Sequence, residues 1–130
     1  MADIIRLDVA AAPSSLPIVR MIVGGVAARL DLSLDDLEDV YLMMEELFCA
    51  TMAPAEGPRL TVTIETAADG ITVDAGPFFS PELRRRLSGE APAGDVDLHA
   101  LFGRVVQSLE VCAAGDDCFS VVFSKRRGAG

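Results

Sequence analysis

The chain has 130 residues, of which 51% are hydrophobic and 24% are charged, a composition that excludes a disordered chain and fits one globular domain. Twenty acidic residues against eleven basic ones give a net charge of −9. Because such a protein repels phosphate backbones and anionic lipids, direct binding to nucleic acid or to a membrane surface is disfavoured. We expect a single domain over residues 1–130 and a partner with a basic surface.

The sequence also bears on the location of the protein. The longest apolar run is interrupted by Arg20 and Arg29, so it falls short of the roughly 20 residues that span a bilayer. The first eight residues, MADIIRLD, do not resemble a signal peptide. Cys49, Cys112 and Cys118 form an odd, sparse set that does not suggest a disulfide framework. These features predict a cytoplasmic protein.

The first half of the sequence predicts a strand followed by two helices. Residues 4–9 alternate between apolar and polar side chains, as a half-buried strand does. Ser33 and Asp36 resemble a capping box that opens the second helix, and Pro54 ends it. Gly24-Gly25 in the first helix suggests a close approach to a neighbouring element. The apolar stripe of the first helix consists of Val19, Ile22, Val23, Val26 and Leu30.

The second half predicts a hairpin, a short helix, a long helix and a second hairpin. The predicted elements are strands 60–66 and 71–74, a short helix 80–87, a loop 88–95, a long helix from residue 98, and strands 109–113 and 119–123. Residues 125–130 are expected to be a frayed end.

The order of these elements predicts the fold class. Strands joined by hairpins, with helices that come first as a pair and then singly, fit an α+β two-layer sandwich. We expect three long helices on one face of a mixed β-sheet of about five strands. A ferredoxin-like arrangement is the alternative, and the helix pair before the first hairpin disfavours it.

Several carboxylates are candidates for a site on the second helix. Asp35, Asp36, Glu38 and Asp39 lie in its first turns, where the helix dipole favours negative charge, and a capped, solvated helix start explains them. Glu46 differs because it lies in an apolar stretch in the middle of the helix. A carboxylate that faces a cleft could act as a general base.

Other chemically active residues have ordinary explanations. Asp74-Ala75-Gly76 is a turn signal, although a carboxylate at a strand end can also accept a hydrogen bond from a ligand amine. His99, the only histidine, has no second ligand or nucleophile near it in the sequence. Cys112 and Cys118 face each other across a predicted hairpin, and two reduced, packed thiols are favoured over a disulfide.

Together, residues 11–20, the run from Asp36 to Glu46 and the Asp74-x-Gly76 segment resemble the bacterial anti-sigma-factor serine kinases. These proteins have the histidine kinase/Hsp90-like (Bergerat, GHKL) ATPase fold, and the resemblance covers nearly the whole chain. It implies that Glu46 matches the catalytic glutamate and that Asp74 and Gly76 match the adenine-binding loop. It also implies that Glu46 and Asp74 line one shallow cleft between the second helix and the sheet.

Four positions depart from the pattern of that family. Ala50 stands where the family has an asparagine that binds magnesium, and alanine cannot ligate a cation. Phe78 replaces the second glycine of the adenine-binding loop, and Leu98 and Ala100 replace the glycines of the lid segment. The resemblance therefore implies a vestigial nucleotide site without metal and without an expected cofactor.

Two functions follow from this resemblance. The first is an anti-sigma-factor-like regulator that binds a sigma factor, with an anti-anti-sigma (STAS) protein as a second partner. Arg20, Asp35, Asp36 and Asp39 are the residues expected to meet the basic surface of the sigma factor. The alternative is an active serine kinase that uses Mg-ATP to phosphorylate a STAS protein. Members of the family form homodimers, so a homodimer is expected. The alternative is a monomer in which Gly24 and Gly25 only permit tight packing of the first helix inside the fold.

Overall fold

The computed structural model describes residues 3–51, 59–89, 98–115 and 117–128. The strands are β1 (Ile4–Ala10), β2 (Arg59–Ala67), β3 (Gly70–Phe78), β4 (Ser108–Ala113) and β5 (Phe119–Arg126). The helices are a 3-10 turn η1 (Pro13–Ser15), then α1 (Leu16–Arg29), α2 (Leu34–Thr51), α3 (Pro81–Leu87) and α4 (Leu98–Val105). The protein is an α+β structure, as the order of predicted elements indicates.

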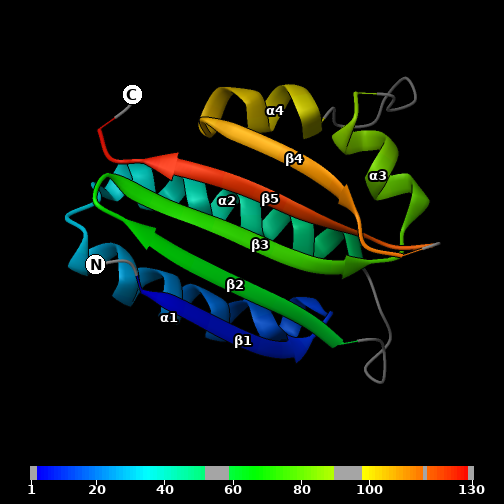
Figure 1. Ribbon diagram of the computed structural model, residues 1–130, viewed down its shortest axis with the longest axis horizontal. Helices are drawn as coiled ribbons and strands as arrows, with labels where there is room; N and C mark the ends of the chain where they lie inside the picture. Colours follow the sequence, from blue (N-terminus) through cyan, green and yellow to red (C-terminus); the bar gives the residue numbers. More distant parts are fainter. Residues whose placement is uncertain (1–2, 52–58, 90–97, 116, 129–130) are drawn as a thin grey trace.

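The strands form one sheet with the order β1-β2-β3-β5-β4, and α1 and α2 lie behind it in the view of Figure 1. Side chains from all four α-helices and from the inner face of the sheet meet in one buried core. The face of the sheet turned toward the viewer is covered by none of the described helices. None of these helices has the length and apolarity that a membrane span requires.

Alternation along the strands separates the two faces of the sheet. In β2, Leu60, Val62 and Ile64 are buried while the residues between them are partly exposed. In β5 the buried positions are Phe119, Val121, Phe123 and Lys125. Since successive side chains in a strand point to opposite faces, these positions form the core side of the sheet.

The expectation of a mixed sheet is wrong, because every pair of neighbouring strands is antiparallel. Two helices, α1 and α2, separate β1 from β2, and this pair returns the chain to the end of the sheet where β1 finishes. Strands β3 and β4 run in the same direction, but β5 lies between them and pairs with both. A parallel pair therefore never forms.

Two further expectations differ from the structure. The third predicted long helix is only eight residues long, because α4 ends at Val105 and β4 begins at Ser108. The C-terminal segment is not frayed at residues 125–128: β5 continues to Arg126, and the Gly128 N–H donates a hydrogen bond to Asp36. Residues 90–95 of the predicted loop lie outside the described part of the chain.

The predicted capping box at the start of α2 is confirmed. The Asp36 N–H donates to Ser33 Oγ at 3.0 Å, and the Ser33 N–H donates to Asp36 Oδ2 at 3.3 Å. These two bonds satisfy backbone donors that the first turn of a helix leaves unpaired. The capping box fixes where α2 begins, and with it the position of every carboxylate along that helix.

The two glycines of α1 have different surroundings. A Cβ on Gly24 would lie 2.8 Å from Tyr41 Oη on α2, whereas a Cβ on Gly25 would meet no atom within 4 Å. The Tyr41 hydroxyl donates a hydrogen bond to the Arg20 carbonyl at 3.1 Å, which holds the ring against α1. The close approach expected of the Gly-Gly pair is therefore confirmed for Gly24 and not for Gly25.

This difference gives a matched pair of substitutions. Gly25→Ala should stabilise the protein by about 1 kcal/mol, since alanine favours a helix by that amount over glycine. Gly24→Ala should stabilise the protein by at least about 1 kcal/mol less than Gly25→Ala, because the new methyl group displaces Tyr41 and weakens its hydrogen bond. Urea unfolding of both variants measures the difference. Equal stabilisation by the two substitutions would contradict the packing of Tyr41 on Gly24.

Candidate functional site

Asp74 lies on the uncovered face of the sheet. Its neighbours in β3, Val73 and Ala75, are both buried, whereas Asp74 is exposed. Across the ladder it lies opposite Thr63 of β2 and Val122 of β5. The Asp74 carboxylate therefore points away from the helices.

Glu46 lies on the other side of the sheet. It belongs to α2 and is half-buried, on a helix whose Met43, Leu47 and Phe48 enter the core. Asp74 lines a hollow on the uncovered face, and Glu46 is not among its lining residues, which are Thr61, Thr63, Asp74, Gly76, Pro77, Ala114, Cys118 and Ser120. The expectation that Glu46 and Asp74 share one cleft is therefore wrong.

Gly76 and Phe78, which the resemblance assigns to a nucleotide loop, have packing roles. A Cβ on Gly76 would lie 2.8 Å from Ser120 Cβ, so the close approach of β3 to β5 requires glycine. The sheet register is irregular between Ala75 and Phe78, which brings Phe78 into the core. The Phe78 ring lies 5.7 Å from the Phe119 ring, centroid to centroid. Packing of the sheet is sufficient to explain these residues.

The remaining departures from the family pattern are placed as follows. Leu98 is fully buried and belongs to the core, whereas Ala100 is exposed on α4. Ala50 lies in α2, and its side chain is outside the described part of the structure. A glycine at position 98 would remove a buried leucine from the core, so the residue found here suits its place in the fold.

The cysteines and the histidine lie at separate places. Cys112 is opposite Ser120 in the register of β4 and β5, not opposite Cys118, and the three thiols are free. His99 Nδ1 lies 3.1 Å from the Leu87 carbonyl, a contact that links α4 to the end of α3. Within the described residues, no group of three or more His, Cys, Asp or Glu side chains is arranged to hold a metal ion.

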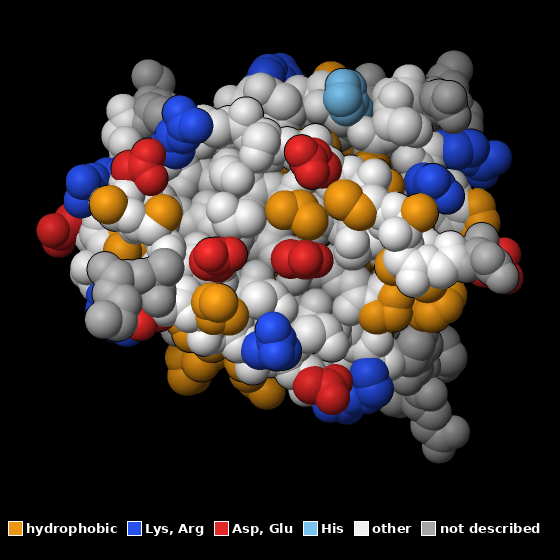
Figure 2. Space-filling model, viewed as in Figure 1, with side chains coloured by type: hydrophobic (Ala, Val, Ile, Leu, Met, Phe, Trp, Pro, Cys, Tyr) orange, Lys and Arg blue, Asp and Glu red, His pale blue; other side chains and the backbone are white. Residues whose placement is uncertain are grey.

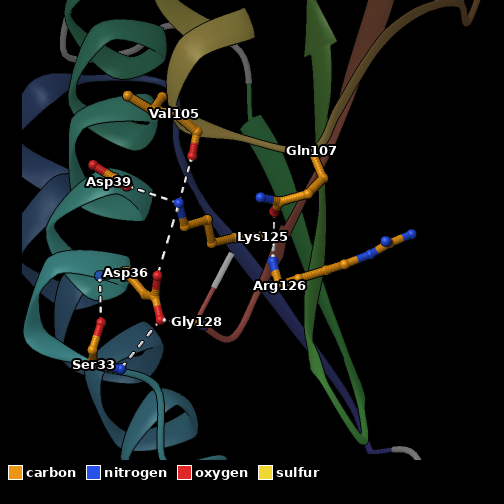
Figure 3. Close-up of polar contacts among 8 residues, drawn as sticks. All are labelled: Ser33, Asp36, Asp39, Val105, Gln107, Lys125, Arg126 and Gly128. Atoms are coloured by element: carbon orange, nitrogen blue, oxygen red, sulfur yellow. Dashed lines mark hydrogen bonds and ion pairs between the residues drawn. The ribbon is translucent and has the colours of Figure 1, made fainter. Parts of the chain in front are cut away.

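The strongest polar cluster surrounds Lys125, the single lysine of the chain (Figure 3). Its side chain is 4% exposed. Lys125 Nζ donates to Asp39 Oδ2 at 2.8 Å and to the Val105 carbonyl at 2.7 Å, and it lies 3.8 Å from Asp36 Oδ1. One ammonium group therefore joins the start of α2, the end of α4 and the last strand.

Asp36 remains ionised inside this cluster. Burial by itself raises the pKa of its carboxyl group, but hydrogen bonds from the Gly128 N–H and from Ser33 outweigh it. The charge of Lys125 acts in the same direction, and the resulting pKa is below the ordinary value of 3.8. The Asp36 carboxylate thus completes the pairing of a buried cation.

The residues expected to contact a partner divide into two groups. Asp36 is 5% exposed, and Asp39 is paired with Lys125, so both serve the interior, while Asp35 remains on the surface. Arg20 Nη2 pairs with Glu45 Oε2 at 3.0 Å, and its guanidinium carbon lies 5.7 Å from the centre of the Tyr41 ring. Of these four residues, Asp35 is the one that is exposed and forms no ion pair with another described residue of the chain.

Sequence reasoning missed Lys125, although its signal is present in the sequence. Phe119, Val121 and Phe123 occupy every second position, and Lys125 continues that series on the core side of β5. A charged residue at an inward position requires a buried partner of opposite charge. The acidic first turns of α2 supply that partner.

The uncovered face carries hydroxyl and carboxylate side chains around a few apolar ones, with the exposed arginines Arg6 and Arg59 toward its β1 edge. Figure 2 shows acidic and basic side chains on this face. Its side chains include Thr61, Thr63, Glu65, Thr72, Asp74, Glu110, Cys112, Ser120, Val122 and Ser124. Glu65, Asp74 and Glu110 are exposed, and Val122 and Cys112 are half-buried. Three carboxylates thus come from three strands to one broad surface.

Comparisons with known proteins give no identification. No protein-family model and no curated protein sequence matches this chain. The resemblance to the anti-sigma-factor kinases therefore rests on the quoted residues alone, and the separation of Glu46 from Asp74 counts against it.

The Lys125 cluster gives a prediction about stability. Lys125→Met should lower the free energy of unfolding by about 3 kcal/mol, because it leaves Asp36 buried without its cation. Arg126→Met, which alters the exposed neighbour, should change it by no more than about 0.5 kcal/mol. Denaturant unfolding of the two variants measures both effects. Equal effects would mean that Lys125 does not pair inside the fold.

The lowered pKa of Asp36 gives a prediction about pH. Because the ionised form is favoured in the folded state, its stabilisation is complete above the unfolded value near 3.8 and is lost as pH falls through the folded pKa. Asp36→Asn should therefore be less stable than the wild type at neutral pH. The difference in free energy of unfolding between the wild type and the variant should become smaller as the pH falls from about 5 to about 2. A constant gap in denaturant unfolding over this range would contradict the assignment.

Proposed function

We propose that this protein is a regulator that acts by binding another protein through the uncovered face of its sheet. The single observation that carries the proposal is that one whole face of a five-stranded sheet lacks a covering layer in the described structure. An antiparallel sheet can leave one face in water, but that face presents side chains from adjacent strands in fixed positions. Such a surface suits recognition of a partner.

The chemistry of the face indicates the partner. Protein interfaces combine a few apolar side chains at the centre with a polar rim, and here Val122 and Cys112 lie among hydroxyl groups and three exposed carboxylates. The net charge of the chain, −9, has the same sign. A basic protein surface is complementary to both, and charge complementarity accelerates association with it.

The resemblance supplies the partner class to test first. It suggests that the basic partner is a bacterial sigma factor and that a STAS protein competes for, or relieves, that binding. The serine-kinase alternative requires Glu46 and Asp74 at one nucleotide. Their places on opposite sides of the sheet favour the binding function over the kinase.

The test removes three charges from the face without changing side-chain size. Glu65→Gln, Asp74→Asn and Glu110→Gln are combined in one variant, and Asp35→Asn, Glu38→Gln and Glu82→Gln in a control variant. All six residues are exposed, and both variants have a net charge of −6. Three exposed charge pairs at about 0.5 kcal/mol each should weaken binding to a purified sigma factor about tenfold.

Isothermal titration calorimetry at two salt concentrations measures the effect. The face variant should bind more weakly and with less salt dependence, whereas the control should match the wild type. Equal affinities of the two variants would show that the face is not the interface. Titration with Mg-ATP tests the alternative function, and tight magnesium-dependent binding would favour the kinase.

A further inference from the structure

The hollow that Asp74 lines is built into the uncovered face, at the end of the sheet where β3 finishes and β5 begins. Its volume is about 420 Å³, so it admits a whole side chain rather than one or two waters. Three of its lining residues, Gly76, Ala114 and Ser120, have a small side chain or none. The hollow exists because little rises above the backbone at these positions.

The shape of the hollow is fixed by the strands around it. Gly76 lies so close to β5 that a Cβ on it would be 2.8 Å from Ser120 Cβ, so a larger residue cannot fill the space from β3 without a shift. On the far side, the Ala114 N–H donates to the Cys118 carbonyl at 3.1 Å. A ligand that enters a site held in this way pays little for ordering the protein.

Asp74 is the one charged side chain among the lining residues. Its carboxylate is exposed and takes part in none of the ion pairs found among the described residues. Two arginines of the same face lie toward β1: Arg59 pairs with Asp8 at 3.0 Å, and Arg6 lies opposite Thr63 without an ion pair to Asp74. Within the described structure, the hollow thus offers a carboxylate that lacks a cation.

The other lining residues favour a guanidinium group over an ammonium group. The hydroxyl oxygens of Thr61, Thr63 and Ser120 can accept hydrogen bonds, and Pro77 adds an apolar wall. A guanidinium carries several N–H donors in one plane on an apolar stem, so it can pair with the carboxylate and also donate to hydroxyl groups. An ammonium group is more strongly hydrated and loses more on entering such a site.

We propose that this hollow is the pocket for one arginine side chain of a protein partner, with the guanidinium paired to Asp74 and the stem against Pro77. The inference rests on the proposed binding function for the source of the arginine, and it adds the group that anchors the partner. Arginine in a central pocket is among the side chains that contribute most to interfaces. Glu65 and Glu110 do not line the hollow, so they are left for other parts of the partner's surface.

The amide of Nα-acetylarginine is a probe for the pocket that needs no partner protein. In NMR titrations of the isotope-labelled chain, it should shift the backbone N–H signals of Thr61, Gly76 and Ser120 along a saturating curve in the millimolar range. The amide of Nα-acetylcitrulline, which has nearly the same shape without the charge, should leave these signals unchanged. The amide of Nα-acetyllysine should bind more weakly than the arginine compound.

Two matched pairs of variants locate the probe. Asp74→Asn should weaken binding of the arginine amide about threefold, since it removes an exposed ion pair, whereas Glu110→Gln removes the same charge outside the hollow and should not. Ala114→Leu should weaken binding by filling the hollow, whereas Ala113→Leu, at the adjacent exposed residue, should not. Circular dichroism establishes that each variant is folded.

Saturating arginine amide should also lower the affinity for a purified sigma factor, relative to the citrulline amide at equal ionic strength. Absence of saturable shifts in the hollow, or equal weakening by Asp74→Asn and Glu110→Gln, would overturn the inference. A sigma factor that binds the uncovered face and is unaffected by the arginine amide would overturn it too and leave the proposed function intact. Arginine amide that fills the hollow when no sigma factor binds would support the arginine site and overturn the proposed partner instead.

Discussion

The buried ammonium group of Lys125 is the interaction on which the arrangement of this fold depends. It joins three elements that are distant in the sequence: the first turns of α2, the last carbonyl of α4 and the end of β5. Removing a charge from water costs several kcal/mol unless it is paired and hydrogen-bonded. Because Asp36, Asp39 and the Val105 carbonyl lie where Lys125 needs them, the cluster specifies how β5 is placed against the helices.

This use of the acidic helix start changes where the function is sought. Acidic first turns of a helix look like a surface for a basic partner, but Asp36 and Asp39 face an internal cation. Exposed negative charge lies on the sheet as well, where Glu65, Asp74 and Glu110 are at the surface.

Much of the fold could be predicted from local sequence patterns. The alternation of residues 60–66, the capping box at Ser33 and the stripe of α1 each have a local cause, and the structure has these elements. The antiparallel pairing could not be predicted, since it depends on β5 entering between β3 and β4, a choice made by long-range packing. Whether a segment forms a strand depends on its local sequence, whereas the order of the strands in the sheet depends on long-range packing.

The candidate site was less predictable for a related reason. Whether Asp74 points to the helices or to solvent depends on parity within β3, and a shift of one residue reverses it. The resemblance to a nucleotide loop placed Asp74 inward, but Val73 and Ala75 take the buried positions. In β5 the alternation of Phe119, Val121 and Phe123 continues to Lys125 and predicts that Lys125 faces the core. The position of Lys125 near the end of the chain, however, favours the expectation of a frayed terminus.

The most direct test of the account is chemical-shift mapping by NMR on the isotope-labelled protein during titration with a purified sigma factor. The account predicts that the perturbed residues cluster on the uncovered face, around Thr63, Asp74 and Val122, while the surface of α2 is little affected. Perturbations centred on Asp35 and Glu46, with the sheet face unchanged, would contradict it.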